Sequence, residues 1–207
     1  MKVFEGSILV NNVSYNLEEL EKDCWIRLIE GSKSSKVPFH LPAIANIRGG
    51  EVTLRTVVLR KVIPELKELR LHTDIRSPKW NDLLLNPQVS LLFYDDIARI
   101  QLRIKGHAIL HYDDAIAKEA WQNTSLSSRK CYLTTLSPSS HADSPTSGLP
   151  EKIEKGELTE EESEMGQQNF GVVAIVVNSI DWLWLNHAGH RRACFDYERG
   201  QFKWMIP

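Results

Sequence analysis

The 207-residue sequence lacks any apolar run long enough to cross a bilayer. Its longest run, Val172 to Val177, is far shorter than the roughly 20 residues that a membrane-spanning helix needs. The first residues, M-K-V-F-E-G, place an acid where a secretory signal would continue its apolar stretch. Cys24, Cys131 and Cys194 are widely spaced, which fits no disulfide framework, and we expect them to be reduced and buried. These absences predict a soluble, cytoplasmic protein without a membrane partner.

Familiar cofactor and catalytic motifs are also missing. The sequence contains no GxGxxG, GxxxxGK[ST], GxSxG, HExxH or CxxC, which excludes the usual nucleotide cradles, serine-hydrolase elbows and zinc motifs. His187 and His190 lie three residues apart around Gly189, but no acid or cysteine accompanies them. We interpret this run as a turn with surface or substrate-facing imidazoles, and we predict no metal site.

The charge is nearly balanced, with a formal net value of −2, which argues against a nucleic-acid partner. The balance hides an asymmetry along the chain. Residues 55–105 hold ten Lys or Arg against six Asp or Glu, whereas residues 151–164 hold seven acids and two lysines. This pattern predicts a local anion site in the middle of the chain rather than a basic surface.

The length and the ordinary apolar and charged fractions, 42% and 25%, predict one globular domain over residues 1–207. Within it, residues 137–150 are rich in Ser, Pro, Gly and Asp, and residues 151–168 are highly charged. A connection of this length is unusual in a compact domain. We therefore expect a mobile or partly helical insertion at about 137–168.

The remaining residues read as an antiparallel strand meander with a few helices. Asn16 is a candidate N-cap and Gly31 a candidate stop for the first helix, and Pro78 and Pro87 bracket a second. Absence of an internal repeat or a parallel βαβ rhythm disfavours a Rossmann fold. We expect further helices over 113–122 and 125–133, and strands at 41–48, 51–60, 68–73, 89–94, 100–107, 172–177, 182–185, 193–197 and 202–205.

Several residues of the basic middle could hold a phosphate. Arg55 and Arg60 on a strand, with Ser77 and Lys79 at a helix start, offer a guanidinium fork, a hydroxyl, a point charge and helix N–H groups. A flat ring would need an apolar slot with a few hydrogen bonds. Backbone groups of the 57–58 pair and the amide of Gln101 could supply them.

A structural interpretation of the same residues is also open. Arg55 could extend along the sheet surface to reach solvent, and Gln101 with Arg103 could form the solvated face of an antiparallel sheet.

Four motifs occur in a characteristic order: R-T-V-V-L-R from Arg55, H-T-D-I-R-S-P-K-W from His72, N-P-Q-V-S-L-L-F from Asn86 and Q-L-R-I-K-G from Gln101. Together they resemble the FMN-binding motifs of the pyridoxamine 5′-phosphate oxidase family, especially its oxidase-like branch. The resemblance covers residues 48–112 well and resumes more loosely over 170–207. It implies a mainly β fold with peripheral helices, an antiparallel split β-barrel that binds FMN, and a homodimer with FMN at the interface.

The resemblance also implies which residues hold the cofactor. The residues at matching positions are Arg55, Thr56, Val57, Val58, Arg60, Thr73, Ser77, Lys79 and Gln101. Of these, Arg55, Thr73 and Lys79 would contact the phosphate and ribityl chain. The pair at 57–58 and Gln101 would address the ring, and Arg60 matches a family lysine near the substrate.

The sequence departs from the family on the substrate side. Where the family grips the substrate phosphate with Tyr, Arg and Ser, this chain has Ala120, Thr124 and Ser128. The Gln-Ser pair of the next loop is replaced by S-P-S-S at 137–140, of which only a serine carries over. A final Arg, His and Arg become the run H-R-R-A-C-F at 190–195, and the tryptophan near the flavin could be Trp182 or Trp184. The remaining candidates for holding a small-molecule substrate are Arg60, Ser128, His190, Arg191 and Arg192.

These departures put vitamin B6 oxidation in doubt but leave the cofactor side intact. The first hypothesis is therefore an FMN-dependent oxidoreductase with an unassigned small-molecule substrate. The alternatives are a non-catalytic protein that binds or senses FMN, and a split-barrel relative that binds haem or a deazaflavin.

Overall fold

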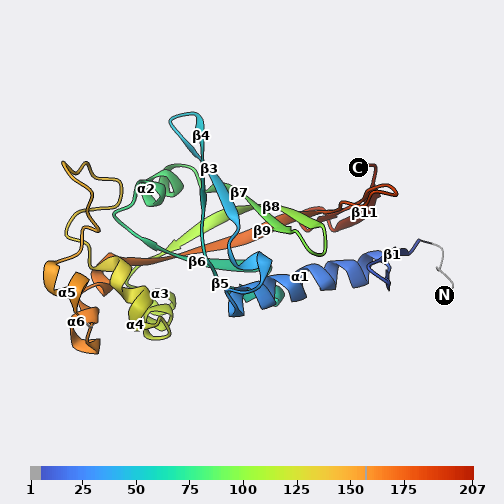
Figure 1. Ribbon diagram of the computed structural model, residues 1–207. Coiled ribbons are helices and arrows are strands. Elements are labelled where there is room, and N and C mark those ends of the chain that lie inside the picture. The colour runs from blue at the N-terminus through green and yellow to red at the C-terminus, as the bar shows by residue number, and fades with distance from the viewer. Residues whose placement is uncertain (1–5, 157) are drawn as a thin grey trace. The chain divides into compact units, whose positions relative to one another are not determined.

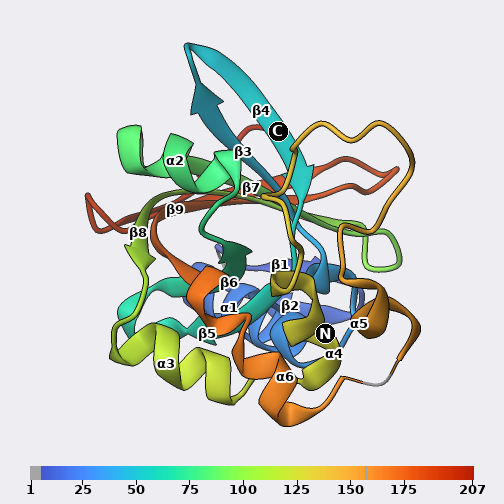
Figure 2. The ribbon, with the colours of Figure 1, turned by 90° about the vertical axis from the view of Figure 1, so that its left-hand side faces the viewer.

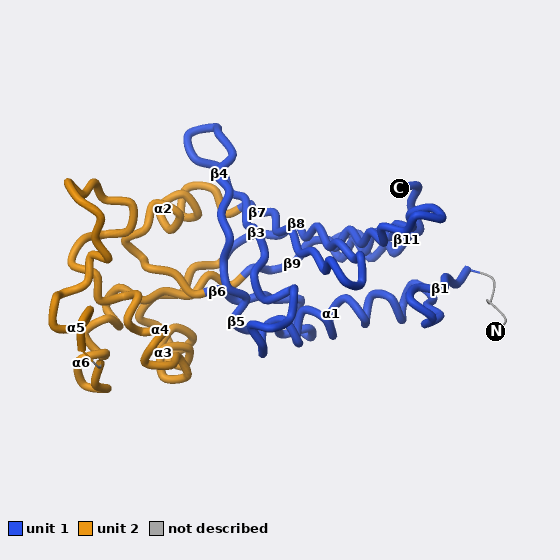
Figure 3. Tube along the Cα trace, in the orientation of Figure 1, with its two compact units in different colours: residues 1–71, 88–108, 175–207 blue, residues 72–87, 109–174 orange. Residues whose placement is uncertain are grey.

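The computed structural model describes residues 6–156 and 158–207, and Figure 1 traces the chain through them. The chain divides into two compact units, which Figure 3 shows in different colours. Unit 1 comprises Met1–Leu71, Gln88–Ala108 and Ile175–Pro207, and unit 2 comprises His72–Pro87 and Ile109–Ala174. Of the insertion expected at 137–168, residue 157 lies outside the described residues.

Strands dominate the described residues, which confirms the mainly β prediction. The strands are β1 (Ile8–Val10), β2 (Val13–Tyr15), β3 (Ala43–Arg48), β4 (Glu51–Thr56), β5 (Leu59–Ile63), β6 (Glu68–Asp74), β7 (Gln88–Asp95), β8 (Ile100–His111), β9 (Phe170–Trp184), β10 (Arg191–Asp196) and β11 (Gln201–Met205). The α-helices are α1 (Leu17–Lys33), α2 (Pro78–Leu85), α3 (Ala115–Gln122), α4 (Leu126–Arg129), α5 (Glu151–Lys155) and α6 (Glu160–Glu164). Short 3₁₀ turns are η1 (Pro38–His40), η2 (Pro64–Leu66), η3 (Lys130–Tyr132) and η4 (Gln167–Asn169). Strands β6, β8 and β9 each have residues in both units. The single domain expected over 1–207 stays a prediction.

The main sheet has the strand order β11-β10-β9-β8-β7-β3-β4, and β6 pairs with β5 and β9. The pairs β3–β4, β3–β7, β7–β8, β9–β10 and β10–β11 are all antiparallel. The neighbours β3–β4, β7–β8, β9–β10 and β10–β11 are also consecutive in the chain, so short connections join them. The antiparallel prediction is confirmed.

In unit 1 this sheet has two chemically different faces. Ile44, Leu91 and Ile104 lie opposite one another across β3, β7 and β8, and all three are buried. We call their side the inner face. Ala45 and Ser90 alternate with them and, with their cross-strand partners, form the outer face. The alternation predicted for residues 100–107 is therefore confirmed.

A strand as apolar as β7 is expected to be buried on both faces, and this expectation is wrong, because β7 is buried on one face alone. Val89, Leu91 and Phe93 are buried, but Leu92 and Tyr94 point to the outer face and are more than 40% exposed. The inner side of β7 packs in the core, whereas its outer side is exposed among the described residues.

Two other strand predictions need correction. The strand expected over 51–60 is interrupted at residues 57–58, where the N–H of Val57 donates to the carbonyl of Pro42 at 2.9 Å. The strands expected at 172–177 and 182–185 are one long strand, β9, because polar residues such as Asn178 remain paired within it. Local alternation could not reveal either outcome, since both depend on partners distant in sequence.

Helix α1 begins at the predicted cap. Asn16 Oδ1 accepts the N–H of Glu19 at 2.9 Å, and Glu19 Oε2 accepts the N–H of Asn16. The helix continues past Gly31, however, and its cap is Ser34. A Cβ at Gly31 would lie 2.7 Å from the Phe39 backbone, so this glycine permits the close approach of η1 rather than ending the helix.

Unit 2 gathers the remaining helices, and Figure 2 shows α3, α4 and α6 side by side. Helix α2 lies between Pro78 and Pro87 as predicted, and α5 and α6 lie within the 137–168 segment. The helix expected over 125–133 is the short α4 followed by η3. Cys24 is buried as expected, but Cys131 is exposed, which corrects the expectation of buried cysteines.

In the part of the chain that the structure describes, no helix is both long and apolar enough to cross a membrane.

Candidate functional site

The candidate cofactor residues fall in both units, with Arg55, Thr56, Val57, Val58, Arg60 and Gln101 in unit 1 and Thr73, Ser77 and Lys79 in unit 2. In unit 1, Arg55 points to the inner face of β4 beside Thr53 and Asn46. Its guanidinium donates to Asn46 Oδ1 and, at 2.8 Å, to Thr53 Oγ1. These two hydrogen bonds orient the guanidinium along the strand.

The residues after Arg55 turn out of the strand. Thr56 ends β4 and is exposed, and Val57 and Val58 form the link to β5. The N–H of Val57 already donates to Pro42, so a ring at this position would use other backbone groups of the link. Arg60 lies on β5 and is exposed, where its charge is accessible to a ligand.

Gln101 lies on the outer face of β8, opposite Tyr94 of β7, and is partly exposed. Arg103, two residues further along the same face, donates to Asp181 Oδ2 at 2.7 Å. Gln101 is therefore neither buried in the core nor fully solvated, and a ligand over the outer face could reach its amide.

In unit 2 the candidate residues gather where β6 leads into α2. Thr73 Oγ1 and Ser77 Oγ lie 3.4 Å apart, and both side chains are buried. Ser77 occupies the N-cap position of α2 and Pro78 its first turn, yet the Ser77 hydroxyl makes no capping bond to the helix. Lys79 follows in the first turn. Two adjacent hydroxyls thus lie at the positive end of a helix whose first turn carries a lysine, which is a favourable setting for an anion.

A neighbouring arginine in this loop is already engaged. Arg76 forms an ion pair with Asp74 at 2.6 Å and donates to the carbonyl and hydroxyl of Thr134 at 3.0 Å. The hydrogen bond to the Asp74 carboxylate raises the pKa of the Arg76 guanidinium. Arg76 therefore shapes the loop, and its charge is compensated.

The substrate candidate Ser128 lies in α4 of unit 2, where its hydroxyl accepts from Ser125 Oγ at 3.1 Å. Thr124, at the position of the family arginine, is buried and donates to the carbonyl of Ala120 at 2.7 Å. These positions are engaged in local structure. The arginine of this region is Arg129, whose buried guanidinium bonds the carbonyls of Trp121 and Thr124 and the Glu164 carboxylate.

The three candidates at the end of the chain do not share one environment. Arg191 pairs with Trp184 across β9 and β10 and lies on the inner face, whereas Arg192 lies on the outer face. Arg192 forms a two-point ion pair with Asp181, at 3.1 and 2.7 Å, and this hydrogen bonding raises its pKa. His190 precedes them in the turn, where its Nδ1 accepts the N–H of Asn186 at 3.2 Å.

Arg103, Lys105 and Arg192 surround a cavity of about 450 Å³ on the outer face of unit 1. Its apolar walls include Leu54 and Leu92. Asp181 compensates two of the three cations, and burial, followed by the nearby Asp181, raises the pKa of the Cys194 thiol at its edge. The sequence alone did not single out Asp181.

The second residue that sequence reasoning missed is Asn46, which is buried and orients Arg55. A polar side chain at an inward position of the apolar strand A-I-A-N-I-R is the signal that could have identified it. Asp181 gave no comparable signal, because its arginine partners lie on two other strands.

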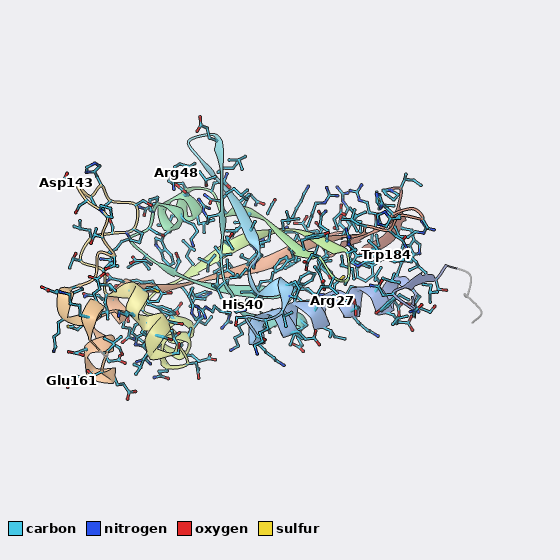
Figure 4. The ribbon with its side chains drawn as sticks, viewed as in Figure 1. Arg27, His40, Arg48, Asp143, Glu161 and Trp184 are labelled. Carbon is cyan, nitrogen blue, oxygen red and sulfur yellow. The ribbon has the colours of Figure 1, made fainter. Side chains whose placement is uncertain are left out.

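The structure distinguishes the two candidate tryptophans. Trp182 is completely buried, whereas Trp184, the last residue of β9 and labelled in Figure 4, is partly exposed. A bound molecule can therefore reach Trp184 without disturbing the core. Among the described residues, no group of three or more His, Cys, Asp or Glu side chains is placed to hold a metal ion.

Residues 22–112 match the family model described as pyridoxamine 5′-phosphate oxidase, FMN-binding domain. The matched segment contains all nine candidate cofactor residues, and the match confirms the family resemblance of the sequence. A search of the curated proteins gave no match.

Solved structures share the fold at low sequence identity. A pyridoxamine 5′-phosphate oxidase-related, FMN-binding protein from Nostoc punctiforme has a TM-score of 0.68 and 18% identity, with 90% of this chain and 97% of that chain covered. PhzG from Burkholderia lata, solved with tetrahydrophenazine-1-carboxylic acid, has a TM-score of 0.66 and 13% identity, with 97% and 100% covered. A Clostridium acetobutylicum protein of the pyridoxinephosphate oxidase family, related to general stress protein 26, has a TM-score of 0.55 and 13% identity, with 90% and 100% covered. These similarities confirm the antiparallel split barrel with peripheral helices.

Proposed function

Since residues 22–112 match the FMN-binding domain of the pyridoxamine 5′-phosphate oxidase family and the chain has the corresponding fold, we propose that the protein binds FMN and is an oxidoreductase acting on a small molecule. The observation that carries the proposal is the start of α2. There the buried hydroxyls of Thr73 and Ser77 lie 3.4 Å apart beside Lys79, and the Ser77 hydroxyl makes no capping bond to its own helix.

This arrangement fits the phosphate of FMN. A phosphate dianion requires several donors and a positive environment, and the hydroxyls, the ammonium and the helix N-terminus provide both. The family resemblance assigns Arg55 to the phosphate as well, and its guanidinium donates to Asn46 and Thr53. Thr56, Val57, Val58, Arg60 and Gln101 are the remaining proposed contacts to the flavin.

When bound, FMN supplies hydride-accepting chemistry, and this chain supplies orientation and electrostatics. The amide of Gln101 would orient the polar edge of the ring from the outer face. Of the substrate candidates, Arg60, His190 and Arg191 are exposed and would attract an anionic substrate.

We also propose a cytoplasmic homodimer with FMN at its interface. The outer face of unit 1 supports it, because Val52, Leu54, Leu92 and Tyr94 are apolar side chains left 41–69% exposed on one sheet face. A contiguous apolar surface of this kind is typical of protein interfaces.

The first experiment is an absorbance spectrum of the purified protein, followed by denaturation and mass analysis of any released cofactor. A two-banded yellow spectrum and released FMN would support the proposal. A haem or deazaflavin spectrum would replace it with the corresponding cofactor, and a colourless protein that does not take up FMN would contradict it.

Turnover requires a second experiment: anaerobic mixing of the FMN-loaded protein with amine, alcohol and nicotinamide donors while flavin absorbance is recorded. Rapid bleaching by a specific donor would support an oxidoreductase. A non-catalytic FMN-binding protein is the second candidate, because the substrate-gripping positions hold Ala120 and a Thr124 that is buried and bonded locally. Stable FMN occupancy without reduction by any donor would favour this candidate.

A further inference from the structure

A second cavity of unit 1, with a volume of about 610 Å³, lies where β9, β10 and β11 end beside β1. Trp184 and Trp204 contribute large aromatic surfaces to it, and Ile8 and Leu9 contribute apolar side chains from β1. This size is typical of a small-molecule site. The remaining lining residues are Gly6, Ser7, His190, Arg191, Arg192, Met205, Ile206 and Pro207.

The two indoles lie on the same side of the sheet as Arg191. Trp184 is the direct cross-strand partner of Arg191, and Trp204 is the partner of Ala193, the next inner-face position of β10. Trp204 Nε1 donates to the carbonyl of Gly6 at 3.2 Å, which fixes its ring against the N-terminal segment.

The charge in this cavity belongs to Arg191. Its Nη1 donates to the carbonyls of Gly189 and His190, at 3.1 and 2.9 Å, and within the described residues it has no acidic partner. Arg192 differs, because Asp181 compensates its charge from the outer face. No acidic side chain occurs among the described residues that line the cavity.

His190 adds an N–H donor. Its Nδ1 accepts the backbone N–H of Asn186, so in the neutral imidazole the proton resides on Nε2. One uncompensated guanidinium with one imidazole N–H suits a monoanionic carboxylate. A phosphate dianion would require a second available cation, which Arg192 does not provide.

We propose that this cavity binds a planar aromatic carboxylate, with its ring against Trp184 and Trp204 and its carboxylate on Arg191 and His190. His190 and Arg191 are also among the residues that the proposed function assigns to the substrate, and the ligand's role as a substrate rests on that function. Binding itself requires no flavin.

The test is calorimetric titration of 2-naphthoate into the protein, both FMN-loaded and flavin-free. The variants are Arg191→Gln and Trp184→Leu, and the matched control is Arg199→Gln, an exposed arginine of the same hairpin. Loss of a charge-assisted hydrogen bond predicts about tenfold or greater weakening in Arg191→Gln. Loss of an indole surface predicts about threefold or greater weakening in Trp184→Leu, and Arg199→Gln should match the wild type.

The neutral analogue 2-naphthalenemethanol should bind the wild type about tenfold more weakly than the acid and should not distinguish Arg191→Gln. Binding of 2-naphthoate that is absent, or equal in the wild type and Arg191→Gln, would overturn the inference. Binding only to the FMN-loaded protein with a change in flavin absorbance would also overturn it, because the acid would then lie on the flavin. If the protein does not bind FMN but binds 2-naphthoate in an Arg191-dependent way, the proposed function is refuted and this site is retained.

Discussion

At the scale of single residues, neighbouring arginines of this chain have different roles because their partners differ. Arg76 and Arg192 are compensated by Asp74 and Asp181, whereas the guanidinium of Arg191 donates to backbone carbonyls. An arginine held by neutral acceptors keeps the charge that an anionic ligand requires. Sequence motifs identified Arg55, but they could not separate Arg191 from Arg192, since strand facing and the distant Asp181 decide the difference.

Helix α3 has a carboxylate as its N-cap, Asp114. Asp114 caps α3 by accepting the N–H of Ala117 at 2.9 Å, and it contacts His111 at 2.7 Å. Burial alone would raise the pKa of Asp114, but the bonds from Ala117 and His111 outweigh burial and lower it. Asp114→Ala should therefore lower the free energy of unfolding at pH 7 by about 1 kcal/mol, measured by urea denaturation.

The pH dependence of this effect follows from the lowered pKa. The contribution of the ionised carboxylate is complete above the unfolded pKa, about 3.9, and is lost as the pH falls through the folded value. The difference between wild type and Asp114→Ala should thus shrink in acid. Asp114→Asn, which keeps the cap without the charge, should stay closer to the wild type at pH 7, and an equal loss in both variants would contradict the role of the cap.

At the scale of elements, the buried Arg129 links α6 to α3 and α4 within unit 2. Its guanidinium bonds the Trp121 and Thr124 carbonyls, Ser163 Oγ and the Glu164 carboxylate, the last at 2.6 Å, and it lies 4.8 Å from the Trp121 ring. Arg129→Leu should lower the free energy of unfolding by about 2–3 kcal/mol, because buried carbonyls lose their donors. Amide exchange in α6 should accelerate.

The matched control is Lys152→Ala, which removes the exposed ion pair between Lys152 of α5 and Glu162 of α6. Exposed pairs contribute little to stability, so exchange in α6 should hardly change in this variant. Equal exchange in α6 for Arg129→Leu and the wild type would show that Arg129 does not anchor the insertion.

Element boundaries were predictable where local chemistry sets them. The capping box of Asn16 and the two prolines around α2 are local signals, and both helices begin as predicted. The interruption after Thr56 and the continuation of α1 past Gly31 depend on Pro42 and Phe39, which pack from elsewhere in the chain. In the candidate site, the ordered motifs gave the candidates around Arg55 and Ser77, whereas Asn46 was not among them and became evident from the strand pairing.

At the scale of the whole molecule, the exposed apolar outer face of unit 1 leads to a prediction of assembly. Leu54→Glu combined with Leu92→Glu should convert the proposed dimer to a monomer in sedimentation analysis, because charges would be buried in an apolar contact. Leu85→Glu is the control, since Leu85 is 89% exposed on α2 and should leave the assembly unchanged. A wild-type protein that sediments as a monomer with flavin bound would refute the dimer.

The central claim is that this chain binds FMN through its phosphate, and the most direct measurement is the ratio of the Kd values for riboflavin and FMN, determined by flavin fluorescence. Two or more charge-assisted hydrogen bonds predict that FMN binds about a hundredfold or more tightly than riboflavin. Lys79→Ala and Ser77→Ala should reduce this ratio, while Lys118→Ala, a surface lysine of unit 2, should not. Equal affinity for riboflavin and FMN, or a ratio unchanged by Lys79→Ala and Ser77→Ala, would contradict the account.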